Sequence, residues 1–68
     1  MDIIEQFSKN IKHLREQNNM TINKFSKLTG ITKSYLLKVE NMQVKTISFK
    51  QLNSFCKVFK AEVKDILY

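Results

Sequence analysis

Residues 20–40 have the sequence MTINKFSKLTGITKSYLLKVE, which contains the only glycine of the 68-residue chain. Thr21 and Thr32 each precede a run of residues that can form a helix. A threonine hydroxyl at such a place can accept a hydrogen bond from a free backbone N–H group. Gly30 lies between the two runs, and glycine takes the left-handed conformation that ends a helix without a steric penalty. This stretch therefore predicts a helix, a tight turn and a second helix.

Apolar residues within this stretch recur at helical spacing. Met20 and Phe25 flank the Thr21 cap with the spacing of a hydrophobic staple, and a second pair flanks Thr32 in the same way. We expect the two helices to span about 22–29 and 33–41. Their inward side chains are expected to be Phe25, Leu28, Ile31, Leu36 and Val39. The side chains left to contact another molecule are Lys33, Ser34, Tyr35 and Lys38.

Three further helices are predicted outside this stretch. Apolar residues at spacings of three and four predict a helix over about 2–18, capped by Asp2. Residues 48–51 match a capping box, which predicts a helix that begins at Ser48 and buries an apolar face that includes Phe49. A short helix follows over about 62–67. The expected fold is all-α: one five-helix domain over 1–68, with a central helix-turn-helix at about 21–41.

Length and composition exclude several classes of function. A chain of 68 residues leaves little room for an enclosed active site. It has one cysteine, one histidine, no paired carboxylates and no glycine-rich phosphate loop, so we expect no enzyme activity, no metal site and no cofactor. No signal peptide and no long apolar run is visible, which predicts a cytoplasmic protein without a membrane partner. No small-molecule ligand is evident.

The positive charge is concentrated in the middle of the chain. The formal net charge is +6, and residues 21–50 carry +5 of it, six lysines against Glu40 alone. A localised basic face is typical of a surface that binds phosphate groups. A lysine-rich surface that only increases solubility is the other interpretation.

Residues 21–40 resemble the helix-turn-helix of the lambda Cro and C1 repressor family. Family members commonly have Thr-Gln, Leu-Ala, Gly-Val-Ser and Ile-x-x-Ile-Glu where this chain has Thr21-Ile22, Phe25-Ser26, Gly30-Ile31-Thr32 and Leu36 to Val39-Glu40. The likeness extends from about Phe7 to Leu67. It implies a lambda-repressor-like domain that binds double-stranded DNA and regulates transcription, with the second helix of the motif in the major groove of an operator.

The resemblance also implies roles for individual residues. Base contacts are expected from Lys33, Ser34 and Lys38, together with the methyl group of Thr32. Phosphate contacts are expected from the start of the first motif helix and from the loop after the second, including their free backbone N–H groups. The candidates are Thr21, Asn23, Tyr35, Asn41 and Lys45. Arg15 and Glu40 are expected to form a structural ion pair, and two unrelated surface charges are the alternative.

Relatives of this size usually act as homodimers on palindromic operators. We expect a dimer surface from the loop and the C-terminal residues: Val44, Ile47, Ile66, Leu67 and Tyr68. The alternative is that the C-terminal apolar residues close the core over the first helix.

Three residues depart from the family pattern. Ile22 replaces the usual glutamine, and Met42 replaces the glycine that usually follows the recognition helix, so its loop is expected to take a different path. Leu37 is apolar on the outward face, where it could touch thymine methyl groups or belong to a protein–protein surface. A protein-interaction module on the same scaffold, such as an antitoxin or an anti-repressor, is therefore the alternative function.

Overall fold

The computed structural model describes residues 2–68 and places five helices and no strand in that range. In order they are α1 (Ile3–Gln17), α2 (Ile22–Thr29), α3 (Lys33–Glu40), α4 (Phe49–Phe59) and α5 (Val63–Leu67). The prediction of an all-α fold with five helices is confirmed. The helix boundaries agree with the expected ranges to within one residue.

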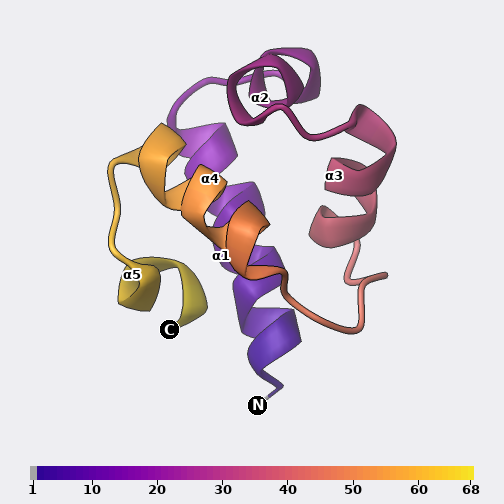
Figure 1. The fold of residues 1–68 in the computed structure, drawn as a ribbon, viewed down its shortest axis with the longest axis vertical. Coiled ribbons are helices and arrows are strands. Elements are labelled where there is room, and N and C mark those ends of the chain that lie inside the picture. Colours follow the sequence, from indigo (N-terminus) through magenta and orange to yellow (C-terminus); the bar gives the residue numbers. More distant parts are fainter. Residues whose placement is uncertain (1) are drawn as a thin grey trace.

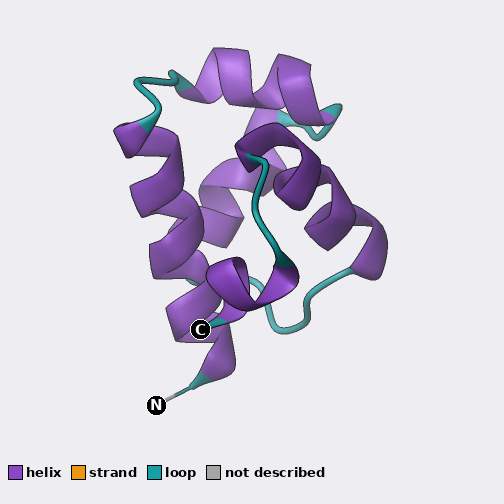
Figure 2. Ribbon diagram, turned by 90° about the vertical axis from the view of Figure 1, so that its left-hand side faces the viewer, coloured by secondary structure: helices purple, strands orange, loops and turns teal. Residues whose placement is uncertain are grey.

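The helices pack around α1, which runs from the end of the molecule that holds both chain termini toward α2 (Figure 1). α1 contacts α3 and α5, α2 contacts α3 and α4, and α4 contacts α5. The loop after α3 lies at the same end of the molecule as the two termini (Figures 1 and 2). This arrangement leaves one side of α3 free of contact with the other helices.

The two threonine caps and the glycine stop form as predicted. The Thr21 hydroxyl accepts from the Lys24 N–H at 3.1 Å, and the Thr32 hydroxyl accepts from the Tyr35 N–H at 3.3 Å. Gly30 ends α2 with a φ of 73°, in the left-handed region. Gly30 and Thr32 thus mark the two ends of the turn between α2 and α3.

The capping box predicted at Ser48 is wrong. Ser48 is the N-cap of α4, but its side chain makes no capping hydrogen bond. Gln51, the expected partner, instead lines a hollow beside the α2–α3 turn. A capping box is found at α5 instead, where the Glu62 N–H donates to Asp65 Oδ2 at 3.1 Å.

All five helices contribute to one hydrophobic core. Phe55 links two other aromatic rings, with its centroid 5.9 Å from Phe7 and 5.5 Å from Phe25. The buried apolar residues are Phe7, Ile11, Phe25, Leu36, Val39, Leu52, Phe55 and Ile66. Because every helix supplies at least one of them, the position of each helix depends on all the others.

Two residues expected in the core are exposed. Leu28 is 52% exposed, because the side of α2 that faces the core is formed by Phe25 and the partly buried Ile22 and Ser26. Phe49 is 78% exposed, because it lies one helical turn before the buried Leu52 and beyond the edge of the core.

Met42 adopts the left-handed conformation, with a φ of 60°. The N–H groups of Met42 and Gln43 donate to the carbonyl oxygens of Val39 and Lys38 at 3.2 and 2.8 Å. This is the Schellman arrangement that ends many helices, and its left-handed position is usually occupied by glycine. Met42 therefore holds a conformation that is unfavourable for a residue with a Cβ atom.

We predict that Met42→Gly raises the free energy of unfolding by about 1 kcal/mol, because it removes this backbone strain. Asn19→Gly is the matched control. Asn19 has a φ of 55° at the end of α1, but asparagine tolerates that conformation better, so its gain is expected to be smaller. Urea unfolding of the three proteins measures both changes. A loss of stability in Met42→Gly would contradict the interpretation.

Candidate nucleic-acid interface

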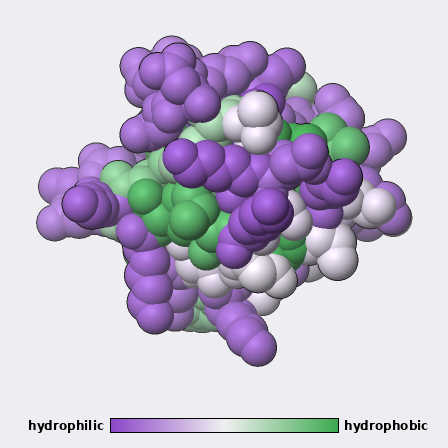
Figure 3. Space-filling model, turned by 90° about the horizontal axis from the view of Figure 1, so that it is seen from above, coloured by the Kyte–Doolittle hydropathy of each residue, from purple (hydrophilic) through white to green (hydrophobic). Residues whose placement is uncertain are grey.

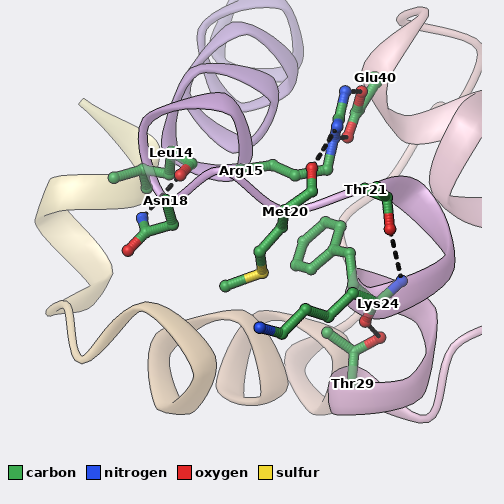
Figure 4. A network of polar contacts seen from close by, with 9 residues as sticks. Leu14, Arg15, Asn18, Met20, Thr21, Lys24, Thr29 and Glu40 are labelled. Atoms are coloured by element: carbon green, nitrogen blue, oxygen red, sulfur yellow. Dashed lines mark hydrogen bonds and ion pairs between the residues drawn. The ribbon is translucent and has the colours of Figure 1, made fainter.

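Arg15 joins α1 to both ends of the helix-turn-helix (Figure 4). Its Nε donates to Glu40 Oε2 at 2.6 Å and its Nη2 to Glu40 Oε1 at 3.0 Å. Its Nη1 donates to the carbonyl oxygen of Met20 at 2.8 Å, directly before the Thr21 cap. One guanidinium group therefore ties the last residue of α3 and the residue that leads into α2 to the same point on α1.

Glu40 depends on this contact because it is only 8% exposed. It is also the last residue of α3, where the helix dipole disfavours a negative charge. The two-bond geometry with Arg15 is the strong form of an arginine–carboxylate contact, and the hydrogen bond to Glu40 raises the pKa of Arg15 above its ordinary value. The two residues that the family resemblance paired are thus joined across 25 positions of sequence.

Two hydroxyl groups from α2 hold the turn that leads into α3. Ser26 Oγ donates to the carbonyl oxygen of Ile31 at 2.5 Å. Thr29 Oγ1 accepts from the Ile31 N–H at 3.2 Å and donates to the Phe25 carbonyl oxygen at 2.8 Å. Both polar backbone groups of Ile31 are therefore satisfied by side chains of α2. This pair was not predicted from the sequence, where no hydrogen bond was assigned to Ser26 or Thr29.

The residues predicted to contact bases lie at the start and on the outward side of α3. Lys33, Ser34 and Lys38 are all exposed. Thr32 is exposed as well, and since its hydroxyl caps the helix, its methyl group is the part left to contact a partner. The opposite side of α3 is buried through Leu36, Val39 and Glu40. The outward side can therefore meet another molecule without any change in the core.

The predicted phosphate-contact residues divide into two groups beside this face. Thr21 and Asn23 are exposed at the N-terminus of α2, and Asn41 and Lys45 are exposed in the loop after α3. Tyr35 is half-buried and lines a hollow of about 370 Å³ between the α2–α3 turn and α4. Lys50 lines the same hollow and was not among the predicted contacts.

The loop after α3 offers fewer backbone donors than the sequence suggested. The N–H groups of Asn41, Met42 and Gln43 all donate to carbonyl oxygens of α3. These three N–H groups are therefore used to end α3 and are not free to donate to a phosphate. The exposed side chains of Asn41 and Lys45 remain available as donors in this loop.

Residues 21–50 expose only positive charge, although their sequence also contains one carboxylate. The six lysines of residues 21–50 are all exposed, and none forms an ion pair within the described part of the chain. Glu40, the only acidic residue of the segment, is buried and neutralised by Arg15. Seen from the α2 end, the surface is mostly hydrophilic, with small apolar areas between the polar side chains (Figure 3).

One residue predicted for the dimer surface is buried. Ile66 is 0% exposed because it packs in the core, so it cannot contact a second molecule. Val44, Ile47 and Leu67 are partly buried, and Tyr68 is 81% exposed. Leu67 and Tyr68 line an apolar hollow with Ile3, which the sequence interpretation did not include.

We predict that Glu40→Gln lowers the free energy of unfolding by about 3 kcal/mol or more, because it leaves the Arg15 charge without its partner. Lys9→Gln is the control, since Lys9 pairs with Glu5 at 3.0 Å where both side chains are largely exposed. That pair is expected to contribute less than about 0.5 kcal/mol. Urea unfolding tests both variants, and similar losses would show that the Arg15–Glu40 pair has no special role.

Ser26→Ala is expected to lower the free energy of unfolding by about 1 kcal/mol relative to Ser54→Ala. Both changes remove a hydroxyl from a helix, so the gain in helix propensity cancels between them. Ser54 Oγ donates only to the Lys50 carbonyl within its own helix, whereas Ser26 holds the turn. Thermal or urea unfolding measures the difference, and equal stabilities would contradict a role for Ser26 in the turn.

Comparison with known proteins agrees with this geometry. The family model of the Cro/C1-type HTH DNA-binding domain matches residues 10–68, which includes the whole of α2, α3 and α4. The search of curated proteins gave no match. Within residues 2–68 no helix combines the length and the apolar character needed to cross a membrane, and no group of side chains there could hold a metal ion. The chain therefore belongs to the family of Cro/C1-type helix-turn-helix DNA-binding domains.

Proposed function

We propose that this protein is a sequence-specific transcriptional regulator that inserts α3 into the major groove of an operator. The observation that supports this most strongly is the outward face of α3. It presents Lys33, Ser34 and Lys38 to solvent, while the only acidic residue of the helix is internal and paired. Such a face has donors for base edges and no exposed carboxylate to repel the DNA backbone.

The residue types on α3 suit contacts with base edges. The lysine ammonium groups can donate to O6 and N7 of guanine, and the Ser34 hydroxyl can donate or accept. The Thr32 methyl group can touch a thymine methyl group while its hydroxyl remains in the helix cap. These contacts would determine which DNA sequence is bound, since they are made to the bases themselves.

Phosphate contacts on both sides of the groove would set the position of α3. The N-terminus of α2, with Thr21 and Asn23, provides a positive helix end and polar side chains for one strand. Asn41 and Lys45 would meet the backbone near the other end of α3. Tyr35 and Lys50 share the hollow beside the turn and would add a contact there.

A homodimer would present two such helices to a palindromic operator. Half-sites one helical turn apart, about 34 Å, match two copies related by a two-fold axis. The apolar groups that reach the surface at the end of the molecule with both termini support this arrangement: Ile3, Val44, Ile47, Leu67 and Tyr68. Regulation by such a cytoplasmic dimer would follow from where it sits on a promoter.

A protein-interaction module, such as an antitoxin or an anti-repressor, is the second candidate. The observation that favours this function is the exposure of two apolar residues, Leu37 on α3 and Met42 in the loop after it. They are 46% and 47% exposed. This function requires no dependence on DNA sequence, and it predicts that DNA affinity stays weak at every salt concentration.

Gel-shift titrations of the full chain against salt, with duplex selected from a random pool, test the proposal. We expect the affinity to fall steeply as salt rises, because lysine contacts release counterions from the DNA. Lys33→Ala and Lys38→Ala are each expected to cost about 1–3 kcal/mol on the selected site and to relax the preference at one base pair.

Lys12→Ala is the control, since Lys12 is an exposed lysine on α1 and outside the proposed face. It should leave the base preference unchanged. If Lys33→Ala and Lys38→Ala select the same sites as the parent protein, α3 is not the helix that contacts the bases.

A further inference from the structure

Leu37 is the one apolar side chain on the outward side of α3. It is 46% exposed and lies one helical turn after Lys33 and Ser34. The next residue is the exposed Lys38, and the helix is followed by the exposed Asn41. Leu37 is therefore surrounded on this side of the helix by polar and charged groups.

The core does not require a leucine at this position. The inward side of α3 is filled by Leu36 and Val39, which are 0% and 1% exposed, and by the paired Glu40. Leu37 itself lies outside this buried set, with 46% of its surface open to solvent. Its side chain is available for a partner that offers an apolar group next to acceptors for the neighbouring lysines.

We infer that Leu37 determines operator specificity by contacting the C5-methyl group of a thymine. This inference rests on the proposed insertion of α3 into the major groove. The thymine methyl is the apolar group that base edges present there, and a guanine in a neighbouring base pair would present acceptors for Lys33 or Lys38 beside it. Each operator half-site would then contain an essential thymine next to the base pairs that the two lysines contact.

The same geometry disfavours cytosine and adenine at that position. Cytosine and adenine present an amino group in the major groove. A leucine placed against an amino group displaces its water without offering a hydrogen-bond acceptor, which leaves a polar group unsatisfied. Leu37 would therefore act both by attraction to thymine and by exclusion of bases that need an acceptor.

A protein partner fits this face less well. Burial of Leu37 in an apolar interface would also bury parts of Lys33 and Lys38, and a charged group is costly to bury unless it is paired. Duplex DNA provides acceptors on base edges and phosphates for both lysines while the methyl group meets the leucine.

Replacement of thymine by uracil, which lacks only the methyl group, tests the inference. The parent protein is titrated with its selected duplex and with duplexes that carry uracil at one thymine at a time. We expect a position in each half-site, separate from any thymine that the Thr32 methyl group touches, where uracil weakens binding about fourfold, the loss that corresponds to one buried methyl group. With Leu37→Ala, the same replacement should have no effect.

Leu28→Ala is the matched control. Leu28 is a similarly exposed leucine, at 52%, but it lies on α2 and outside the proposed face. This variant should keep the full fourfold sensitivity to uracil, about the same as the parent. Circular dichroism of both variants would show that each keeps its helices.

The outcomes separate this inference from the proposed function. Steep salt dependence with no uracil effect at any thymine would overturn the role of Leu37 and leave the DNA-binding proposal standing. The role of Leu37 is also overturned if Leu37→Ala remains as sensitive to uracil as the parent. Absence of salt-dependent binding would overturn both.

Discussion

A single guanidinium group ties both ends of the helix-turn-helix to α1. Arg15 holds the Glu40 carboxylate through two hydrogen bonds and the Met20 carbonyl through a third. These two partners lie at opposite ends of the helix-turn-helix, so one side chain of α1 holds the start of α2 and the end of α3. Because a buried carboxylate is unstable without a partner, the fold has one favourable place for the end of α3.

The turn between α2 and α3 provides the second constraint. Gly30 supplies the left-handed residue, and the hydroxyls of Ser26 and Thr29 satisfy the backbone of Ile31. Together with Arg15, this fixes both the direction in which α3 leaves the turn and the place where it ends. The proposed contacts of α3 with base edges need this rigidity, since small displacements of its side chains would change which base edge they reach.

Local sequence signals predicted the helices well. They did not predict contacts between distant residues or where the hydrophobic core ends. Thr21, Gly30 and Thr32 act through their nearest neighbours, so their roles follow from the sequence alone. Periodicity predicted the buried side of each helix but not where the core ends, which is why Leu28 and Phe49 were placed wrongly. The Arg15–Glu40 contact spans 25 positions and came only from the family resemblance. The bonds of Ser26 depend on the turn's three-dimensional path, for which the sequence holds no simple signal.

The most direct test of the proposed DNA-binding face is amide chemical-shift mapping of the full chain as its selected duplex is added. We expect the largest changes at residues 32–38 and at the start of α2, with further changes at Asn41 and Lys45. Residues on the exposed side of α1, such as Lys12, should change little. If α3 keeps its free-protein shifts while the duplex is bound elsewhere, the outward side of α3 is not the surface that meets DNA.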